Sequence, residues 1–435
     1  MHPLAIGASA LCAIVVLAAL RLPIGVAIGL VALSGIWISS GPVLMGVTLQ
    51  TLPYATGADY AFIVVPMFVL MGNIAAAAGM IEAMFDAAAK WLARTRGGLY
   101  IAVTLASAGF AAISGSTVVN AAVFTRMVLP QMVRLGYDKC ASAGCIAAAG
   151  TFAVMIPPSL GFVLYGIMTG ESVGKLFAAG IVPGLLTAGA YIAMIMVMVR
   201  VRPHWAPPPQ QAFTRAERLA SLKPLWAISL LVAIVLGGIY SGTFPPSAAG
   251  AIGALGALLI AVGQRRMSPG KLWECITQSA IMASSLFFIV IAGFLFARFM
   301  ISSGFVPQLT SAVAESGIGK WEFIAMMVVL YFVLGMFIDG ASMAVVTLPF
   351  VYPVGKTLGI DGIWFGVIFV KLIEIGAITP PVGMNLFAVV AASQGRMKLA
   401  DVIRGIGWFV FLEVAILGLL LAFPAISLWL PTLIG

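Results

Sequence analysis

Residues 113–121 read Ile-Ser-Gly-Ser-Thr-Val-Val-Asn-Ala, and this stretch decides how the rest of the chain is organised. It lies in an apolar run, residues 97–125, that contains no charged residue. A second uncharged run, residues 140–170, carries the tandem prolines Pro157-Pro158. Small polar residues and prolines interrupt membrane helices, and lipid cannot satisfy the main-chain groups that an interruption frees. Since such interruptions persist where they line a protein-enclosed site, we interpret this region as half of an ion and solute binding site.

The composition is that of a membrane protein. Hydrophobic residues make up 62% of the sequence and charged residues only 9%, whereas soluble globular proteins carry roughly 25% charged residues. The composition therefore predicts a polytopic membrane protein and excludes the soluble classes. The net charge of +9 would indicate nucleic acid only if the basic residues formed one patch. They are spread over short loops, so we expect no nucleic acid partner and interpret the charge as a topology signal.

The N-terminal region is apolar from Pro3 to Leu20, and its first basic residue, Arg21, follows that run. A cleaved signal peptide carries its positive charge before the apolar segment, so we expect a retained first span. The four cysteines form no Cys-x-x-Cys pair, which favours structural roles over metal binding or disulfides.

The first hundred residues divide into apolar and polar segments. Residues 3–20 and 23–39 predict two helices, and residues 60–80 predict a third span. Residues 40–59 are rich in Gly, Pro and Thr, which is typical of a loop or a short dipping segment. Residues 81–96 are amphipathic and end in basic side chains, so we expect a helix that lies in the membrane interface.

Residues 99–133 are long enough to cross the membrane once, yet both flanks are basic. A segment with both ends on the positive side should turn back, so we predict a re-entrant hairpin with its tip at Ser114-Gly115-Ser116. Residues 140–170 predict a long helix that is broken at Pro157-Pro158, and residues 176–199 predict a returning span.

A basic, proline-containing linker, residues 201–224, separates residues 1–200 from residues 225–435. The second part repeats the first at an offset of 223 residues, at which Pro157-Pro158 matches Pro380-Pro381. We therefore treat the two parts as copies of one fold.

The same offset predicts a second hairpin over about residues 322–355 and a second broken helix over about residues 362–393. Each repeat then has about five transmembrane helices and one re-entrant hairpin, and the odd number of crossings inverts the second repeat. With a cytoplasmic linker, most of the 23 Lys and Arg residues lie on the cytoplasmic side. The sequence thus predicts an all-α polytopic protein of two inverted repeats, with both termini outside.

Two hairpins that enter from opposite faces bring their tips together near the midplane. Helix N-termini there direct N–H groups at an anion, and the carbonyls and hydroxyls of broken helices form an oxygen cage for sodium. The candidate sodium ligands are Ser114, Ser116, Ala153, Ile156, Pro158, Asp339, Gly340, Gly376, Thr379 and Pro381. The candidate substrate residues are Ser116, Thr117, Asn120, Ser342 and Asn385.

Each of these assignments has a structural alternative. The tandem prolines could form plain kinks, Asp339 could cap a helix, and Asn120 and Asn385 could form hydrogen bonds between helices. An ionised acid in mid-membrane costs several kcal/mol, so Glu374 is a functional candidate. Lys371 lies one turn before it, and a structural ion pair is the alternative role for Glu374.

Four motifs together resemble the large membrane subunit of TRAP transporters, the DctM-like permeases, and the resemblance covers essentially the whole chain. They are Ser114–Ala121, Gly150–Ser159, Gly335–Asp339 and Glu374–Asn385. The last reads Glu-Ile-Gly-Ala-Ile-Thr-Pro-Pro-Val-Gly-Met-Asn and is the most specific of the four.

The resemblance implies a sodium-coupled importer of an organic acid, either a C4-dicarboxylate, a sugar acid such as sialic acid, or a keto acid. It implies an elevator mechanism in the inner membrane, a small four-helix membrane subunit, and a periplasmic binding protein that delivers the substrate. It also implies sodium sites between hairpin tips and broken helices. Ala153 stands where the family often has glycine, and no fused four-helix extension is evident, so we expect the small subunit to be a separate polypeptide.

We therefore expect a transporter that performs no covalent chemistry. A self-sufficient cation–dicarboxylate symporter that needs no binding protein is the first alternative. An intramembrane enzyme is disfavoured because the only histidines, His2 and His204, lie at the terminus and in the linker. A passive channel is disfavoured by helix breaks arranged as closed cages. The sequence leaves open which organic acid is carried.

Overall fold

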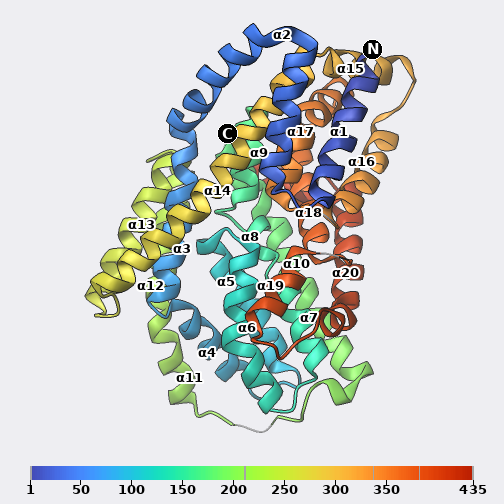
Figure 1. Cartoon of the computed structure of the whole chain (residues 1–435). Helices are drawn as coiled ribbons and strands as arrows, with labels where there is room; N and C mark the ends of the chain where they lie inside the picture. The colour runs from blue at the N-terminus through green and yellow to red at the C-terminus, as the bar shows by residue number, and fades with distance from the viewer. Residues whose placement is uncertain (1, 210–211, 337, 382, 434–435) are drawn as a thin grey trace.

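The computed structural model describes residues 2–209, 212–336, 338–381 and 383–433. Over these residues the chain is helical, with three short 3-10 helices and no strand (Figure 1). The first α-helices are α1 (Pro3–Ala19), α2 (Ile24–Ala58), α3 (Val64–Ala77), α4 (Met80–Leu92), α5 (Gly98–Ser114), α6 (Thr117–Arg134), α7 (Lys139–Ala149), α8 (Phe152–Met155), α9 (Leu160–Thr169), α10 (Val173–Val201) and α11 (Arg215–Leu222). The rest are α12 (Trp226–Tyr240), α13 (Pro246–Gly263), α14 (Pro269–Ser302), α15 (Phe305–Glu315), α16 (Lys320–Gly335), α17 (Gly340–Thr357), α18 (Gly362–Ile378), α19 (Met384–Ala392), α20 (Leu399–Ala422) and α21 (Ala425–Leu433). The 3-10 helices are η1 (Tyr60–Ile63), η2 (Pro203–Trp205) and η3 (Lys223–Leu225).

Eight helical segments of the described chain are long and apolar enough to cross a membrane. A helix satisfies its own backbone groups, which is why lipid-spanning chains of this composition fold as helices. The prediction of an all-α polytopic membrane protein is confirmed.

The helices of the second half follow those of the first at a constant spacing. Since α6 spans Thr117–Arg134 and α17 spans Gly340–Thr357, both ends of α17 lie 223 residues after those of α6. The two halves are interleaved, because α6 packs on α19 and α17 packs on α9. The second helix of each hairpin thus packs on the helix that follows the break in the other half.

Residues 40–59, predicted as a loop or short dipping segment, are helical. They form the second part of α2, which bends sharply at Gly41 (φ 85°, ψ 172°) and continues toward α3 (Figure 1). Glycine adopts this positive φ readily, and Pro42 fits the first turn of the segment that follows. The loop prediction was wrong because the same two residue types that end a helix can also join two helices at an angle.

Parts of the predicted linker, residues 201–224, are helical. Thr214 and Glu217 form a capping box at the start of α11. Before it, the guanidinium of Arg96 donates hydrogen bonds to the carbonyls of Pro203 (2.7 Å) and Ala206 (3.4 Å). The Tyr100 hydroxyl donates to the Trp205 carbonyl at 2.8 Å. The N-terminal part of the linker is therefore hydrogen-bonded to residues at the start of the α5–α6 hairpin.

Candidate functional site

The first hairpin turns within three residues. Helix α5 ends at Ser114, and Gly115 adopts a left-handed conformation with φ 61°, which glycine permits without a Cβ clash. Ser116 is extended, and α6 starts at Thr117. The chain thus reverses at Ser114–Ser116 and leaves the N-terminus of α6 without a side-chain cap.

The second hairpin, α16 and α17, turns before Asp339; Phe337 lies outside the described residues. One carboxylate oxygen of Asp339 accepts hydrogen bonds from the N–H groups of Ala341 and Ser342, both at 3.0 Å. The other accepts from the Ser342 hydroxyl at 2.5 Å. Asp339 is thus the N-cap of α17, which is the structural alternative considered above, and Ser342 serves the same cap.

Two helices break at the tandem prolines. Residues 156–159 separate α8 from α9, and residues 379–383 separate α18 from α19; both Pro-Pro peptide bonds are cis. The broken segments leave carbonyl oxygens that accept no hydrogen bond from any described residue. These oxygens belong to Ala153, Ile156, Pro158, Thr379 and Pro381. The Gly376 carbonyl, by contrast, accepts from the Thr379 N–H at 3.2 Å.

Each hairpin lies against the break of its own half. A Cβ added to Gly115 would lie 3.2 Å from the Pro158 carbonyl oxygen. A Cβ added to Gly335, at the end of α16, would lie 2.5 Å from the Gly376 Cα. Glycine at these positions allows the backbones of tip and break to approach closely. Most candidate sodium ligands therefore gather in two places, one in each half.

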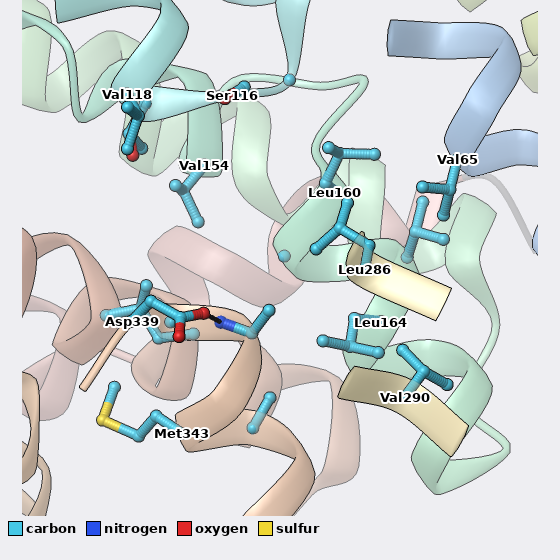
Figure 2. Close-up of a pocket in the computed structure, with 18 of the residues that line it drawn as sticks. Val65, Ser116, Val118, Val154, Leu160, Leu164, Leu286, Val290, Asp339 and Met343 are labelled. Carbon is cyan, nitrogen blue, oxygen red and sulfur yellow. Dashed lines mark hydrogen bonds between the residues drawn. The ribbon is translucent and has the colours of Figure 1, made fainter. Parts of the chain in front are cut away.

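A cavity of about 390 Å³ joins the two hairpin tips. Its walls come from the tips, Val154 of α8, α9, the middle of α14, the start of α3, the end of α18 and the start of α19. Figure 2 shows Ser116 and Val118 of the first hairpin and Asp339 of the second around the same space. Among the sodium and substrate candidates, those that line it are Ser116, Thr117, Asp339 and Gly340.

The two asparagine candidates bond to protein groups. The Asn120 amide nitrogen donates to the Ser107 carbonyl (3.3 Å), and its oxygen accepts from the Ser107 hydroxyl (3.0 Å). This is the hydrogen bond between helices that the sequence left as the alternative. The Asn385 amide nitrogen donates to the Ala147 carbonyl at 3.0 Å, joining α19 to α7. Its buried oxygen has no partner among the described residues.

The pattern of the family described as "Tripartite ATP-independent periplasmic transporter, DctM component" matches residues 11–426. The chain belongs to this family. It is a multi-pass membrane protein of a bacterial inner-membrane transport system, and it is not an enzyme.

Relatives of the DctM family support the assignment over most of the chain. The C4-dicarboxylate TRAP transporter large permease protein DctM of Pseudomonas aeruginosa is 36% identical over 386 residues, covering 88% of each chain. The 2,3-diketo-L-gulonate TRAP transporter large permease protein YiaN of Escherichia coli is 33% identical, covering 86% of this chain and 87% of the relative. The solved structure of the Alcanivorax borkumensis YdaH transporter superposes with a TM-score of 0.59 at 15% identity, covering 87% and 89% of the two chains. That likeness shows a shared fold alone.

This DctM-family chain also contains a buried charged cluster away from the cavity. The ion pair that the sequence left as the alternative role for Glu374 is present, with the Lys371 ammonium 2.8 Å from Glu374. Lys371 also contacts Glu413 of α20 and donates to the Thr187 hydroxyl of α10 at 3.1 Å. The Tyr191 hydroxyl donates to Glu413 at 2.5 Å. The cluster thus connects α10, α18 and α20.

Sequence reasoning missed Glu413. It is the one acid in the apolar run 405–423 of the DctM-family sequence, and an intramembrane acid is a signal in itself. All three charged side chains are fully buried, and none lines the cavity. We therefore assign the cluster to the packing of α10, α18 and α20.

Proposed function

We propose that this chain carries an organic acid inward across the inner membrane, driven by sodium, and that the cavity between the hairpin tips holds the substrate. The observation that carries the proposal is the convergence of four helix N-termini on this one cavity. Residues Thr117, Leu160, Gly340 and Met384 begin α6, α9, α17 and α19, and all four line it. Helix N-termini attract anions through their free N–H groups and their dipoles.

Two of the four N-termini are open to a substrate. Asp339 caps α17, and the Ser159 hydroxyl accepts from the Phe162 N–H (3.3 Å) to cap α9. No side chain caps α6 or α19 among the described residues. We assign the substrate carboxylate to the N–H groups of these two helices.

Sodium is the proposed coupling ion. Carbonyl and hydroxyl oxygens are the ligands that hard cations prefer, and the two breaks supply carbonyls that accept no bond from described residues. The buried Ser114 hydroxyl likewise has no partner in the described chain. The Thr379 hydroxyl donates to the Ile375 carbonyl at 2.6 Å, which leaves its lone pairs for a cation. These groups support one site at each break.

The proposed mechanism is an elevator built from two inverted repeats, with the linker cytoplasmic and both termini periplasmic. The constant spacing between α6 and α17 and the interleaving of the halves support it. In this scheme the hairpins and broken helices move together, while the α2–α3 and α13–α14 helices remain fixed.

The proposed partners are a small four-helix membrane subunit and a periplasmic binding protein. The tripartite description of the family supports them. The substrates that name the relatives support an organic acid as the substrate class, which includes C4-dicarboxylates, sugar acids and keto acids.

Uptake by proteoliposomes tests the function. The chain, reconstituted with the small subunit, should accumulate a labelled acid only when an inward sodium gradient and the binding protein are both present. Uptake without the binding protein would favour a self-sufficient symporter. Equal uptake when choline replaces sodium would contradict the coupling.

The sodium sites predict a specific effect of two substitutions. Ser114→Ala and Thr379→Ala should each raise the sodium concentration for half-maximal uptake by about tenfold, because each removes one oxygen ligand worth about 1.4 kcal/mol. Thr125→Ala is the matched control, since the buried Thr125 hydroxyl bonds to the Ala121 carbonyl (2.7 Å) in the same manner. An unchanged sodium dependence in both variants would refute the cage assignment.

A further inference from the structure

We propose that the carried acid is a monocarboxylate with an apolar body, rather than a dicarboxylate or a polyhydroxylated acid. This inference rests on the proposed function, because it concerns the substrate of the same cavity. Three observations support it: the separation of polar and apolar walls, the absence of a second ionic partner, and the fusion of the two open N-termini into one anion site.

Most polar side chains of the cavity lie at the hairpin tips, and a wall of aliphatic side chains lies across from them. Among the described lining residues, the polar side chains are Ser116 and Thr117 of the first tip, Asp339 of the second, and Ser285 of α14. Figure 2 shows the opposite wall as an aliphatic cluster. Its labelled members are Val65, Leu164, Leu286 and Val290. A substrate whose carboxylate lies at the hairpin tips therefore places the rest of the molecule against aliphatic side chains.

Among the described residues that line the cavity, no basic side chain is available for a second charge. The described lining residues contain no Lys, Arg, His, Asn or Gln. The Ser285 hydroxyl already donates to the Ile281 carbonyl of its own helix at 3.0 Å. A second carboxylate against this wall would lose water without gaining a partner, and so would the hydroxyls of a sugar acid. An alkyl or aryl group would gain from the same burial.

The two uncapped N-termini form one anion site and not two. A Cβ added to Gly150 would lie 3.1 Å from both the Asn385 amide nitrogen and the Thr117 carbonyl oxygen. Thr117 is the first residue of α6, and Asn385 lies in the first turn of α19, so the two helices begin side by side. The Asp339 carboxylate occupies the first N–H groups of α17. The geometry provides for a single carboxylate.

Binding measurements on the purified chain in complex with its small subunit, in the absence of the binding protein, distinguish an apolar monocarboxylate from a dicarboxylate or a polyhydroxylated acid. We would titrate 4-methylpentanoate, succinate and threonate in sodium and in choline by calorimetry. The first two have equal numbers of non-hydrogen atoms, so they differ in polarity and not in size. We expect 4-methylpentanoate to bind at least about tenfold more tightly than succinate or threonate in sodium, since the unpartnered polar groups penalise the latter two.

Tighter sodium-dependent binding of succinate or threonate would overturn this inference and leave the proposed function intact. If none of the three acids bound in a sodium-dependent manner, this inference would also be overturned, and the proposed function would be decided by the proteoliposome uptake described above.

Variants of the apolar wall give a second readout. Leu164→Asn and Leu286→Asn each place an amide on the wall, so the preference for 4-methylpentanoate over succinate should fall by about fivefold or more. Leu185→Asn is the control, because Leu185 is 63% exposed on α10 and does not line the cavity. An unchanged preference in both wall variants, with unaltered thermal unfolding, would place the substrate body elsewhere and overturn the proposal.

Discussion

Replacing Lys371 by methionine should prevent the protein from accumulating in the membrane. The Lys371 ammonium is the shared partner of Glu374 and Glu413, and all three side chains are fully buried. Removal of one partner from a buried ion pair costs about 3–5 kcal/mol, because the remaining charge is left uncompensated. That loss is a large part of the 5–15 kcal/mol that is typical of a folded domain. The measurement is the yield of folded protein in membranes, together with its thermal unfolding in nanodiscs.

Two controls test whether charge is the cause. The triple variant Lys371→Met, Glu374→Gln, Glu413→Gln removes every charge of the cluster and should recover much of the yield. Lys356→Met breaks the Lys356–Glu171 pair, whose lysine side chain is 49% exposed, and should cost only about 0–1 kcal/mol. Native yield and stability of the single Lys371 variant would show that the cluster contributes nothing to the fold.

Gly376→Ala and Gly335→Ala should abolish most of the sodium-driven uptake. Each added Cβ would meet the Cα of the other glycine, at 2.6 Å and 2.5 Å respectively. The backbone of α16 or α18 must move to relieve this contact, which costs about 1–3 kcal/mol in a packed interior. Because the shift falls on the second hairpin and break, we expect initial uptake rates to fall by about tenfold or more.

The matched control for this pair is Gly189→Ala in α10, where an added Cβ meets nothing within 4 Å. Alanine there should leave uptake unchanged. Initial rates over a sodium series, measured alongside thermal unfolding, separate a site effect from a general loss of stability. Wild-type rates for both the Gly335 and Gly376 variants would mean that hairpin and break do not approach closely in the working protein.

Local chemistry was enough to predict the positions where the helices break. The Ser-Gly-Ser tip and the two Pro-Pro pairs interrupt apolar segments, and the breaks lie at these residues. Residues 40–59 failed because Gly41 and Pro42 are compatible with a loop or with a bend between two helices. Which form occurs depends on how the apolar segment after Pro42 packs in the fold. That packing cannot be predicted from the residues around Gly41.

The candidate site was predicted in outline and not in detail. Ser116, Thr117, Asp339 and Gly340 line the cavity because they follow directly from the turn chemistry at the tips. The partners of Asn120 and Asn385 depend on which helix packs beside each amide, and no local pattern determines that choice. Glu413 is visible in the sequence as an intramembrane acid, but its pairing with Lys371 is not, because the two residues are distant in sequence and only the packed fold brings them together.

Helix α14 contains 34 residues, which at 1.5 Å per residue makes it about 51 Å long. The hydrocarbon layer is only about 30 Å thick, so α14 is longer than a perpendicular crossing needs, and its first turns carry the polar side chains Lys271, Glu274 and Gln278. Bilayer thickness therefore changes how much of α14 lies inclined within lipid and how much extends beyond it. The cavity wall at Ile281–Val290 lies in the middle of α14. A change in membrane thickness would therefore act on one wall of the proposed substrate cavity, which couples the cavity to the surrounding bilayer.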